Sequence, residues 1–409
     1  MTHSSASAVL GHKGLVNAGQ THADGELRAE AAAALVADGL EGLLATRRGP
    51  SDAASTPRPK ARALTLEPVA PGLLRVGDIA SCRIDAPSDA AAATMLQATL
   101  QGPGGAAWRA TLRLDQALPE AAAASAPDPA GPALPPLRVL RPMRKSHCDQ
   151  AGHVNVQVFM DLADEASTVL GLEAIGKDAA LRITQARISF KRELFEGDVV
   201  AVHSGIRLVD GQQLEVVHGI VDQASGALAC VLETRLRSDA PIAIATAERV
   251  GDWPALPLAR PPAAPRASAE PPADAVTTSL SVVDAWDADR SGCLSARAMV
   301  NLCSTGARCY LASIGLDGAR FLREQITVAA VDYLIDIRER PPMGCGLAFR
   351  SAFLSGSAKS IRFSHHLVDG DNGTVYAVVE IVGVMLDLKT HRSMEIPGDV
   401  RQRLRLAID

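Results

Sequence analysis

The chain of 409 residues contains few aromatic side chains, only 3% of the total. Proteins that bind single-stranded nucleic acid stack bases on aromatic rings, and nucleic-acid binding also needs clustered positive charge. The 41 Lys and Arg residues are outnumbered by 46 Asp and Glu, which gives a net charge of −5. Both features argue against a nucleic-acid partner.

Signals for secretion and membrane insertion are also absent from the sequence. The opening "MTHSSASAVLGHKG" has no apolar core of a signal peptide, and no run of 18 apolar residues occurs. The seven cysteines include no C-x-x-C pair. We therefore expect reduced thiols in a cytoplasmic protein that has no membrane segment.

Several catalytic signatures are missing as well. There is no G-x-S-x-G turn for a serine hydrolase and no glycine-rich phosphate loop. His365 and His366 are neighbours, but adjacent strand residues face opposite sides of a sheet and cannot share a metal. We expect no metal site and no cofactor.

Two Ala/Pro-rich stretches, 117–136 and 248–277, interrupt the patterned sequence. Proline removes backbone donors and favours extended chain, so both stretches are typical of semi-rigid linkers. They separate three segments of ordinary domain size, 10–116, 137–247 and 278–409.

The three segments resemble one another. Each has a glycine-containing turn ("THADGEL", "CDQAGHVN" and "DADRSGCLS"), then a helical pattern, then several β-rich runs. In the middle helix Phe159, Leu162, Ala166 and Leu170 share one face, and Gly171 offers a stop. The pattern predicts three copies of one α+β domain.

The later β-rich runs also repeat. Residues 214–237 and 359–387 each contain a glycine turn between two runs, which is a hairpin signal. His218 and His366 fall at similar places in these hairpins, which favours a structural role for both.

The middle turn, D-x-x-G-H-V-N, is followed by a carboxylate on the helix and by "FEGDVV" in the strand region. With these motifs the chain resembles the hot-dog fold superfamily, and within it the acyl-CoA thioesterases of the 4-hydroxybenzoyl-CoA and betainyl-CoA type. The resemblance implies tandem hot-dog domains, each an antiparallel sheet wrapped around one long helix. The residues that carry it are Asp149, Gly152, His153, Asn155 and Glu165.

The other two copies depart from this motif. The third keeps the aspartate, Asp289, but has Cys293 and Ser295 where the middle copy has His and Asn. The first copy keeps only Gly25. Plant-type acyl-carrier thioesterases, which the turn also resembles, place an Asn where this chain has Ala151. We therefore expect one competent copy, the middle one.

These residue types suit attack on a thioester carbonyl. Asp149 can serve as general base or nucleophile, or it can simply cap the helix. Gly152 would allow close approach of substrate, beside helix N–H groups that stabilise an oxyanion. His153 would orient water or bind the carbonyl. Asn155 would hold Asp149 or the water, or serve only as a turn residue.

Other candidates lie further along the chain. In related enzymes a carboxylate on this helix is sometimes the base, so Glu165 competes with Asp149 for that role. Lys191 and Arg192 could meet the phosphates of coenzyme A, although exposed charges on strands are usually only solvated.

The resemblance implies an acyl-CoA thioester hydrolase. One alternative is a hot-dog protein that binds acyl thioesters or assembles a complex without catalysis. Another is an enoyl-CoA hydratase of the same fold, but in that family one more residue separates the aspartate and histidine of the turn. Acyl-CoA is the expected partner in either enzymatic case.

The number of copies bears on assembly. Hot-dog domains pair edge to edge, and an exposed sheet edge promotes aggregation. With three copies, we expect two to pair within the chain, the middle copy among them, and the third to pair across a two-fold axis. The sequence therefore predicts a homodimer.

Overall fold

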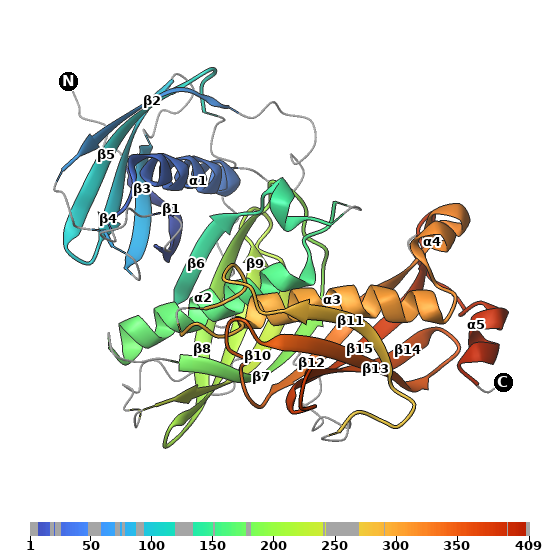
Figure 1. The fold of residues 1–409 in the computed structure, drawn as a ribbon. Coiled ribbons are helices and arrows are strands. Elements are labelled where there is room, and N and C mark those ends of the chain that lie inside the picture. Colours follow the sequence, from blue (N-terminus) through green and yellow to red (C-terminus); the bar gives the residue numbers. More distant parts are fainter. Residues whose placement is uncertain are drawn as a thin grey trace, which may run out of the picture.

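The computed structural model describes residues 7–16, 20, 26–47, 59–69, 74–75, 78–86, 94–118, 134–149, 152–176, 181–239, 242, 270–289, 291–390 and 392–405. These residues form a 16-stranded antiparallel sheet with long helices against it (Figure 1). Most of the expected linkers, 117–136 and 248–277, lies outside the described residues. No helix within these ranges is long and apolar enough to cross a membrane.

Three units follow one another along the chain. The first contains β1 (Ser7–Leu15), α1 (Ala29–Arg47), β2 (Ala61–Pro68), β3 (Ile79–Ala86), β4 (Met95–Gly102) and β5 (Gly105–Leu114). The second contains β6 (Leu137–Pro142), the 3-10 helix η3 (Lys145–His147), α2 (Val156–Ala174), β7 (Leu181–Phe190), β8 (Val199–Asp210), β9 (Gln213–Asp222) and β10 (Leu228–Ser238). The third contains β11 (Val276–Val282), α3 (Ala296–Ser313), α4 (Gly318–Glu324), β12 (Ile326–Ile337), β13 (Gly346–Gly356), β14 (Ser360–Asp369), β15 (Val375–Asp387), β16 (Arg392–Ser393) and α5 (Gly398–Arg403).

The strand order is the same in all three units: β1-β3-β4-β5-β2, then β6-β8-β9-β10-β7, then β11-β13-β14-β15-β12. In each unit the long helix lies against the sheet (Figure 1). The predicted α+β class and tandem hot-dog architecture are confirmed.

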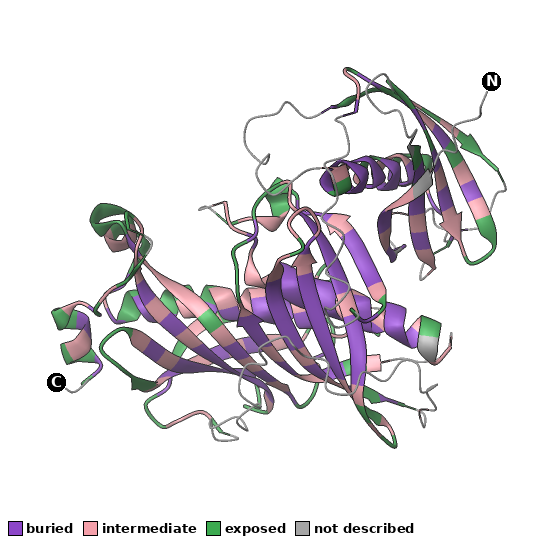
Figure 2. Cartoon of the chain, turned by 180° about the vertical axis from the view of Figure 1, so that it is seen from behind, coloured by how far each residue is buried: buried purple, intermediate pink, exposed green. Residues whose placement is uncertain are grey.

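Burial follows from the sequence pattern. Phe159, Leu162, Ala166 and Leu170 of α2 are all buried in a core that the middle and third units share. The first unit has a core of its own under α1. Buried residues line the faces of helix and sheet that meet, while exposed residues gather at strand ends and loops (Figure 2).

Two local expectations were wrong. Helix α2 runs through Gly171 to Ala174, and the left-handed residue that follows is Gly176, with φ +122°. Each unit also begins with a strand before its turn, which the sequence pattern did not indicate. Strand β11 even begins at Val276, within the stretch that was expected to be a linker.

The units join edge to edge. Strands β7 and β12 pair over five residues, from Asp332 opposite Ser189 to Asp336 opposite Gln185. The middle unit therefore pairs within the chain, as expected, and its partner here is the third unit. It also pairs with the first, because Lys13 of β1 lies opposite Leu140 of β6. The expectation that one copy lacks a partner within the chain was wrong, so the homodimer stays a prediction without that premise.

A buried histidine ties strands together in the middle unit. His218 Nδ1 lies 2.8 Å from Ser204 Oγ, and its Nε2 lies 3.0 Å from Thr234 Oγ1. Burial lowers the pKa of His218 to about 3, so the ring is neutral and structural. In the third unit the residue with this serine contact is His365, 2.5 Å from Ser351 Oγ. The counterpart of His218 is therefore His365, not His366.

Candidate active site

The middle turn is closed by its own backbone. The Asp149 N–H donates to the His153 carbonyl at 2.8 Å, and the Gly152 N–H donates to the Asp149 carbonyl at 3.1 Å. The His153 N–H donates to Asp149 Oδ1 at 3.1 Å. Gly152 has φ +84°, a left-handed conformation that favours glycine. The turn thus fixes the aspartate and histidine side by side before α2.

Asn155 caps the helix. Its side-chain oxygen accepts the Gln157 N–H at 3.3 Å, and its own N–H donates to the His147 carbonyl at 2.9 Å. In the third unit Ser295 does the same for α3, accepting the Ala298 N–H at 3.2 Å. The structure therefore gives Asn155 a capping task. A further contact with the attacking water remains a proposal.

The structure adds a residue that the sequence reasoning missed. Glu193 Oε2 lies 3.8 Å from His153 Nε2. Phe195, two residues later, pairs with His153 through an isolated β-bridge, and their rings meet edge to face at 5.2 Å. No local sequence signal pointed to Glu193, because its approach to His153 depends on the bridge from Phe195 to the turn. The Asp149 carboxylate thus contacts the backbone of His153, and Glu193 lies beside the His153 ring.

Glu165 belongs to a different environment. It lies ten residues beyond the cap of α2, which is about 15 Å along a helix axis. Its carboxylate pairs with Arg141 at 3.1 Å, and the side chain is 15% exposed. A Cβ added at Gly14 of β1 would lie 2.6 Å from Glu165 Oε1. Glu165 therefore packs against the first unit, and the structure does not bring it to Asp149.

Charged groups of two units surround this carboxylate. Arg141 also bonds Asp161 at 2.7 Å, and Asp38 of α1 bonds Arg144 at 2.5 Å. Burial, then Arg141 and Arg144, lower the pKa of His12 to about 3. Both histidines near these arginines are neutral, because burial and Arg141 also lower the pKa of His147 to about 4. The cluster joins the two units and is poorly suited to proton transfer.

The two candidate phosphate contacts follow β7 directly. The Lys191 and Arg192 N–H groups both donate to the Ala229 carbonyl. The Arg192 side chain bonds Ser225 at 2.8 Å and Asp222 at 3.3 Å, so it braces the β9–β10 turn. Lys191 is exposed.

The third unit repeats the turn with different side chains. The Asp289 N–H donates to the Cys293 carbonyl at 2.7 Å, as in the middle unit. Asp289 also accepts bonds from Ser291 at 2.5 Å and from Arg340 at 2.5 Å. Burial alone would raise the pKa of Asp289, but Ser291 and the Arg340 guanidinium outweigh it and lower that pKa. The Asp289 carboxylate therefore stays ionised, and the positive charge of Arg340 balances it.

The remaining sequence expectations concern the first unit and metals. Gly25, the one residue that the first turn shares with the motif, lies outside the described residues. Within the described residues no group of three His, Cys, Asp or Glu side chains is placed to hold a metal ion.

The amino-acid sequence matches the model of one protein family. The sequence profile described as "Thioesterase-like superfamily" matches residues 143–238 and 283–404, together more than half of the chain. The chain belongs to the thioesterase-like superfamily. Both matched stretches lie in the middle and third units, which share a core. This places the chain among hydrolases that act on thioester bonds. No curated protein matches the sequence.

Several solved structures are similar to the chain at low identity. An acyl-ACP thioesterase from Bacteroides thetaiotaomicron is 10% identical over 60% of this chain and 96% of its own, with a TM-score of 0.47. The 12:0-ACP thioesterase from Umbellularia californica is 11% identical over 60% and 92%, at 0.44. A 1,4-dihydroxy-2-naphthoyl-CoA thioesterase from Synechocystis is 15% identical over 32% and 96%, at 0.30.

Proposed function

We propose that the chain hydrolyses acyl-CoA thioesters at the middle turn. The observation that carries this proposal is that Asp149 accepts the His153 N–H at the entrance of α2, while Glu193 lies 3.8 Å from His153 Nε2. Neither other unit offers such a group among its described residues: in the third, Cys293 replaces the histidine, and Arg340 neutralises the aspartate.

We assign each residue a role in this proposal. Asp149 takes a proton from water as the water oxygen bonds to the thioester carbon, and it later returns that proton to the departing thiolate when the C–S bond breaks. The products are a free acid and coenzyme A. His153 binds the carbonyl oxygen as negative charge develops there, and Glu193 beside Nε2 stabilises the ring while it shares its proton.

Glu193 marks the difference between the two turns. The bridge from His153 to Phe195 corresponds to the bridge from Cys293 to Pro342. Two residues before these partners stand Glu193 in the middle unit and Arg340 in the third. The middle turn thus has a second carboxylate where the third has the cation that neutralises its aspartate. This supports hydrolysis at one copy only.

The test is a panel of acyl-CoAs of different chain length, mixed with the pure protein and a thiol reagent. Release of coenzyme A by the wild type, and its loss in His153→Ala, would support the proposal. Binding of acyl-CoA without release would support the alternative of a non-catalytic acyl-thioester protein. The third unit supports that alternative, because its backbone forms the same turn although Cys293 replaces the histidine.

A further inference from the structure

The pairing of the middle and third units has an internal two-fold symmetry. The five residue pairs that join β7 to β12 are centred on Arg187 opposite Leu334. Each strand also carries one extra residue directly before its end of this ladder, Thr184 in β7 and Val331 in β12. Exchanging the two units about the central pair therefore superposes the ladder on itself and Thr184 on Val331. Each position in one unit thus has an equivalent in the other.

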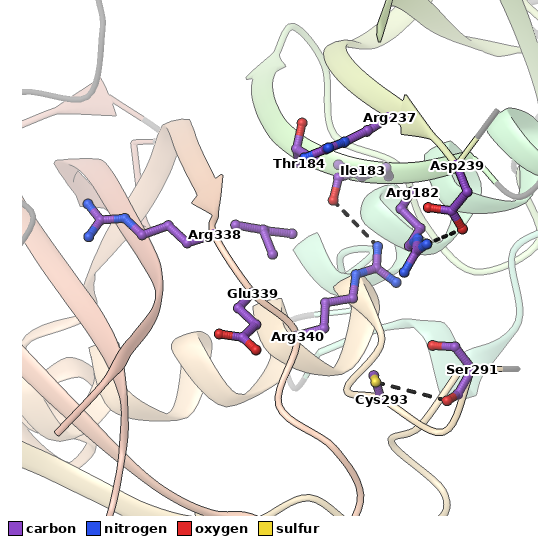
Figure 3. Close-up of a pocket in the computed structure, with 11 residues that line it drawn as sticks. Arg182, Ile183, Thr184, Arg237, Asp239, Ser291, Cys293, Arg338, Glu339 and Arg340 are labelled. Atoms are coloured by element: carbon purple, nitrogen blue, oxygen red, sulfur yellow. Dashed lines mark hydrogen bonds and ion pairs between the residues drawn. The ribbon is translucent and has the colours of Figure 1, made fainter. Parts of the chain in front are cut away.

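A pocket of about 370 Å³ shows how the turn of one unit faces the strand ends of the other (Figure 3). The third unit contributes Ser291 and Cys293 of its turn and the segment 337–340. The middle unit contributes the start of β7 and the end of β10. The two units touch here, because Arg340 Nη2 donates to the Ile183 carbonyl at 3.5 Å.

The same symmetry relates this pocket to the middle turn. His153 is the equivalent of Cys293, since each residue forms the isolated bridge of its turn. Glu193 is the equivalent of Arg340, two residues before the bridging partner. The two side chains that lie 3.8 Å apart in the proposed site are therefore the equivalents of two pocket-lining residues. The start of β12 and the end of β15 correspond to the strand ends that line the pocket.

Strand β12 reaches the middle unit beside its turn. The Phe190 ring, at the end of β7, meets the Tyr333 ring of β12 at 6.2 Å and the Phe159 ring of α2 at 5.1 Å. Phe159 lies about one helical turn beyond Asn155, the cap of α2. Helix α2, β7 and β12 therefore meet next to the proposed site.

The two equivalent walls differ in polarity. In the pocket, the middle unit supplies a wall in which charged residues predominate: Arg182, Ile183, Thr184, Arg237 and Asp239. Counted from the extra residue of each strand, the equivalents in the third unit are all apolar: Ala329, Ala330, Val331, Val384 and Leu386. Val331 is 39% exposed, and the other four are half-buried. Partly exposed apolar surface of this kind gains free energy when an apolar group covers it.

We propose that this apolar wall of the third unit completes the proposed site, and that the substrate there is a coenzyme A thioester of an uncharged, apolar acyl group. The proposal rests on the proposed function and names its substrate class. An apolar chain that extends from the carbonyl at His153 removes its own surface and that of Ala329 and Val384 from water. A charged acyl group would lose its hydration against the same wall without gaining a partner.

Calorimetric titration with two thioethers of coenzyme A tests the proposal, because a thioether binds without being hydrolysed. S-hexyl-CoA and S-(5-carboxypentyl)-CoA carry chains of equal length, and only the second ends in a carboxylate. We expect the wild type to bind the hexyl compound at least about tenfold more tightly. The decisive variant is Ala329→Arg, which gives β12 the residue that β7 has at the equivalent position. Its guanidinium can pair with the carboxylate, so the preference should disappear or reverse.

Two further variants separate this effect from damage to the fold. Val331→Thr gives β12 the residue of Thr184 and replaces only a methyl group by a hydroxyl, so the preference should fall by about threefold. The matched control is Arg182→Ala, at the pocket position that is equivalent to Ala329. The ion pair of Arg182 with Asp239 is exposed, so the fold should persist and the preference should stay within about twofold of the wild type.

Equal affinities of the wild type for the two thioethers, tighter binding of the charged one, or absence of binding of both would overturn the proposal. An Ala329→Arg variant that keeps the wild-type preference would overturn it as well. Hydrolysis of hexanoyl-CoA is followed separately. Hydrolysis together with equal thioether affinities would reject the apolar substrate class alone, and a thioether preference without hydrolysis would reject the proposed function alone.

Discussion

The two aspartates at the turns occupy the same backbone conformation but meet different partners. Asp289 is bonded to Arg340 and Ser291, whereas Asp149 shares its turn with a histidine that Glu193 supports. We predict that Asp149→Asn lowers turnover by at least about a hundredfold, the scale of a lost general base. Acyl-CoA hydrolysis, followed by coenzyme A release, measures it. Unchanged circular dichroism would show that the fold is kept.

The matched change in the third unit is Asp289→Asn. We expect it to leave most of the activity, because Cys293 and Ser295 cannot supply the hydrogen bonds of a histidine and an asparagine. Turnover as low as that of Asp149→Asn would mean that the two turns act together, and that the assignment of a single competent copy is wrong.

Glu193 carries the second prediction at this scale. Glu193→Gln keeps the shape of the side chain but removes the charge 3.8 Å from His153 Nε2. We expect kcat to fall about tenfold or more, since the ring loses the carboxylate beside it. The control is Glu196→Gln, an exposed carboxylate three residues away. Equal effects of the two changes would remove Glu193 from the mechanism.

The sequence yielded part of this site and not the rest, for a physical reason. Asp149, Gly152 and His153 lie within five residues, so a local turn pattern was enough to group them. Glu193 is forty residues from His153 and reaches it only because Phe195 bridges to the turn. That contact depends on tertiary packing. Glu165 was grouped with the turn through the resemblance to related enzymes, but it lies ten residues along the helix from the cap.

At the scale of elements, the two ends of α2 have different neighbours: the proposed site lies at its start, and the first unit packs further along it. Its entrance carries the turn, while its face further along presents Glu165 to Arg141 and the first unit. We predict that Glu165→Gln leaves kcat within about threefold but lowers the free energy of unfolding by about 1–2 kcal/mol, the cost of weakening a buried hydrogen bond to a charged group. Urea unfolding and turnover, measured on one preparation, decide this. A variant that is stable but inactive would make Glu165 the base.

Helix α1 of the first unit holds the segment that leads into the turn. Asp38 bonds Arg144 at 2.5 Å, and the Arg144 N–H donates to His147 Nδ1 at 3.1 Å. We predict that Asp38→Asn lowers kcat severalfold without changing KM, because the substrate does not touch it. A double-mutant cycle with Arg144→Gln should give a coupling of about 0.5–1 kcal/mol.

The control for that cycle is Glu30→Gln, an exposed change on the same helix. The coupling is measured on the free energy of unfolding. If the effects of Asp38→Asn and Arg144→Gln on that free energy were additive, the first unit would not position the turn. The same would follow if Asp38→Asn raised KM and left kcat unchanged.

The elements that the sequence predicted are those with local signals. Helices follow from apolar periodicity, and hairpins such as β9–β10 follow from a glycine between two β-rich runs. The opening strands β1, β6 and β11 were missed because they are short or carry glycine and polar residues. Their place in each sheet, beside the third strand of the unit, depends on long-range pairing.

At the scale of the whole molecule, pairing of all three units leaves two ends of the described sheet, β2 and β11. Strand β2 carries Arg62, Glu67 and Pro68, residues that discourage pairing with another strand. Strand β11 instead exposes Leu280 and Val282, at 76% and 57%. An edge of this kind is a ready template for a second copy.

We therefore predict a homodimer that forms through β11, with two copies of the strand antiparallel across a two-fold axis. Light scattering of the wild type should give twice the chain mass of 42.7 kDa. Leu280→Lys should shift the mass toward one chain, because a charge on an edge strand opposes pairing. Arg62→Lys on β2, which keeps the charge of the other edge, should leave the wild-type mass unchanged. A mass near one chain that is stable to concentration would rule out the dimer, and an unaltered dimer in Leu280→Lys would move the contact away from β11.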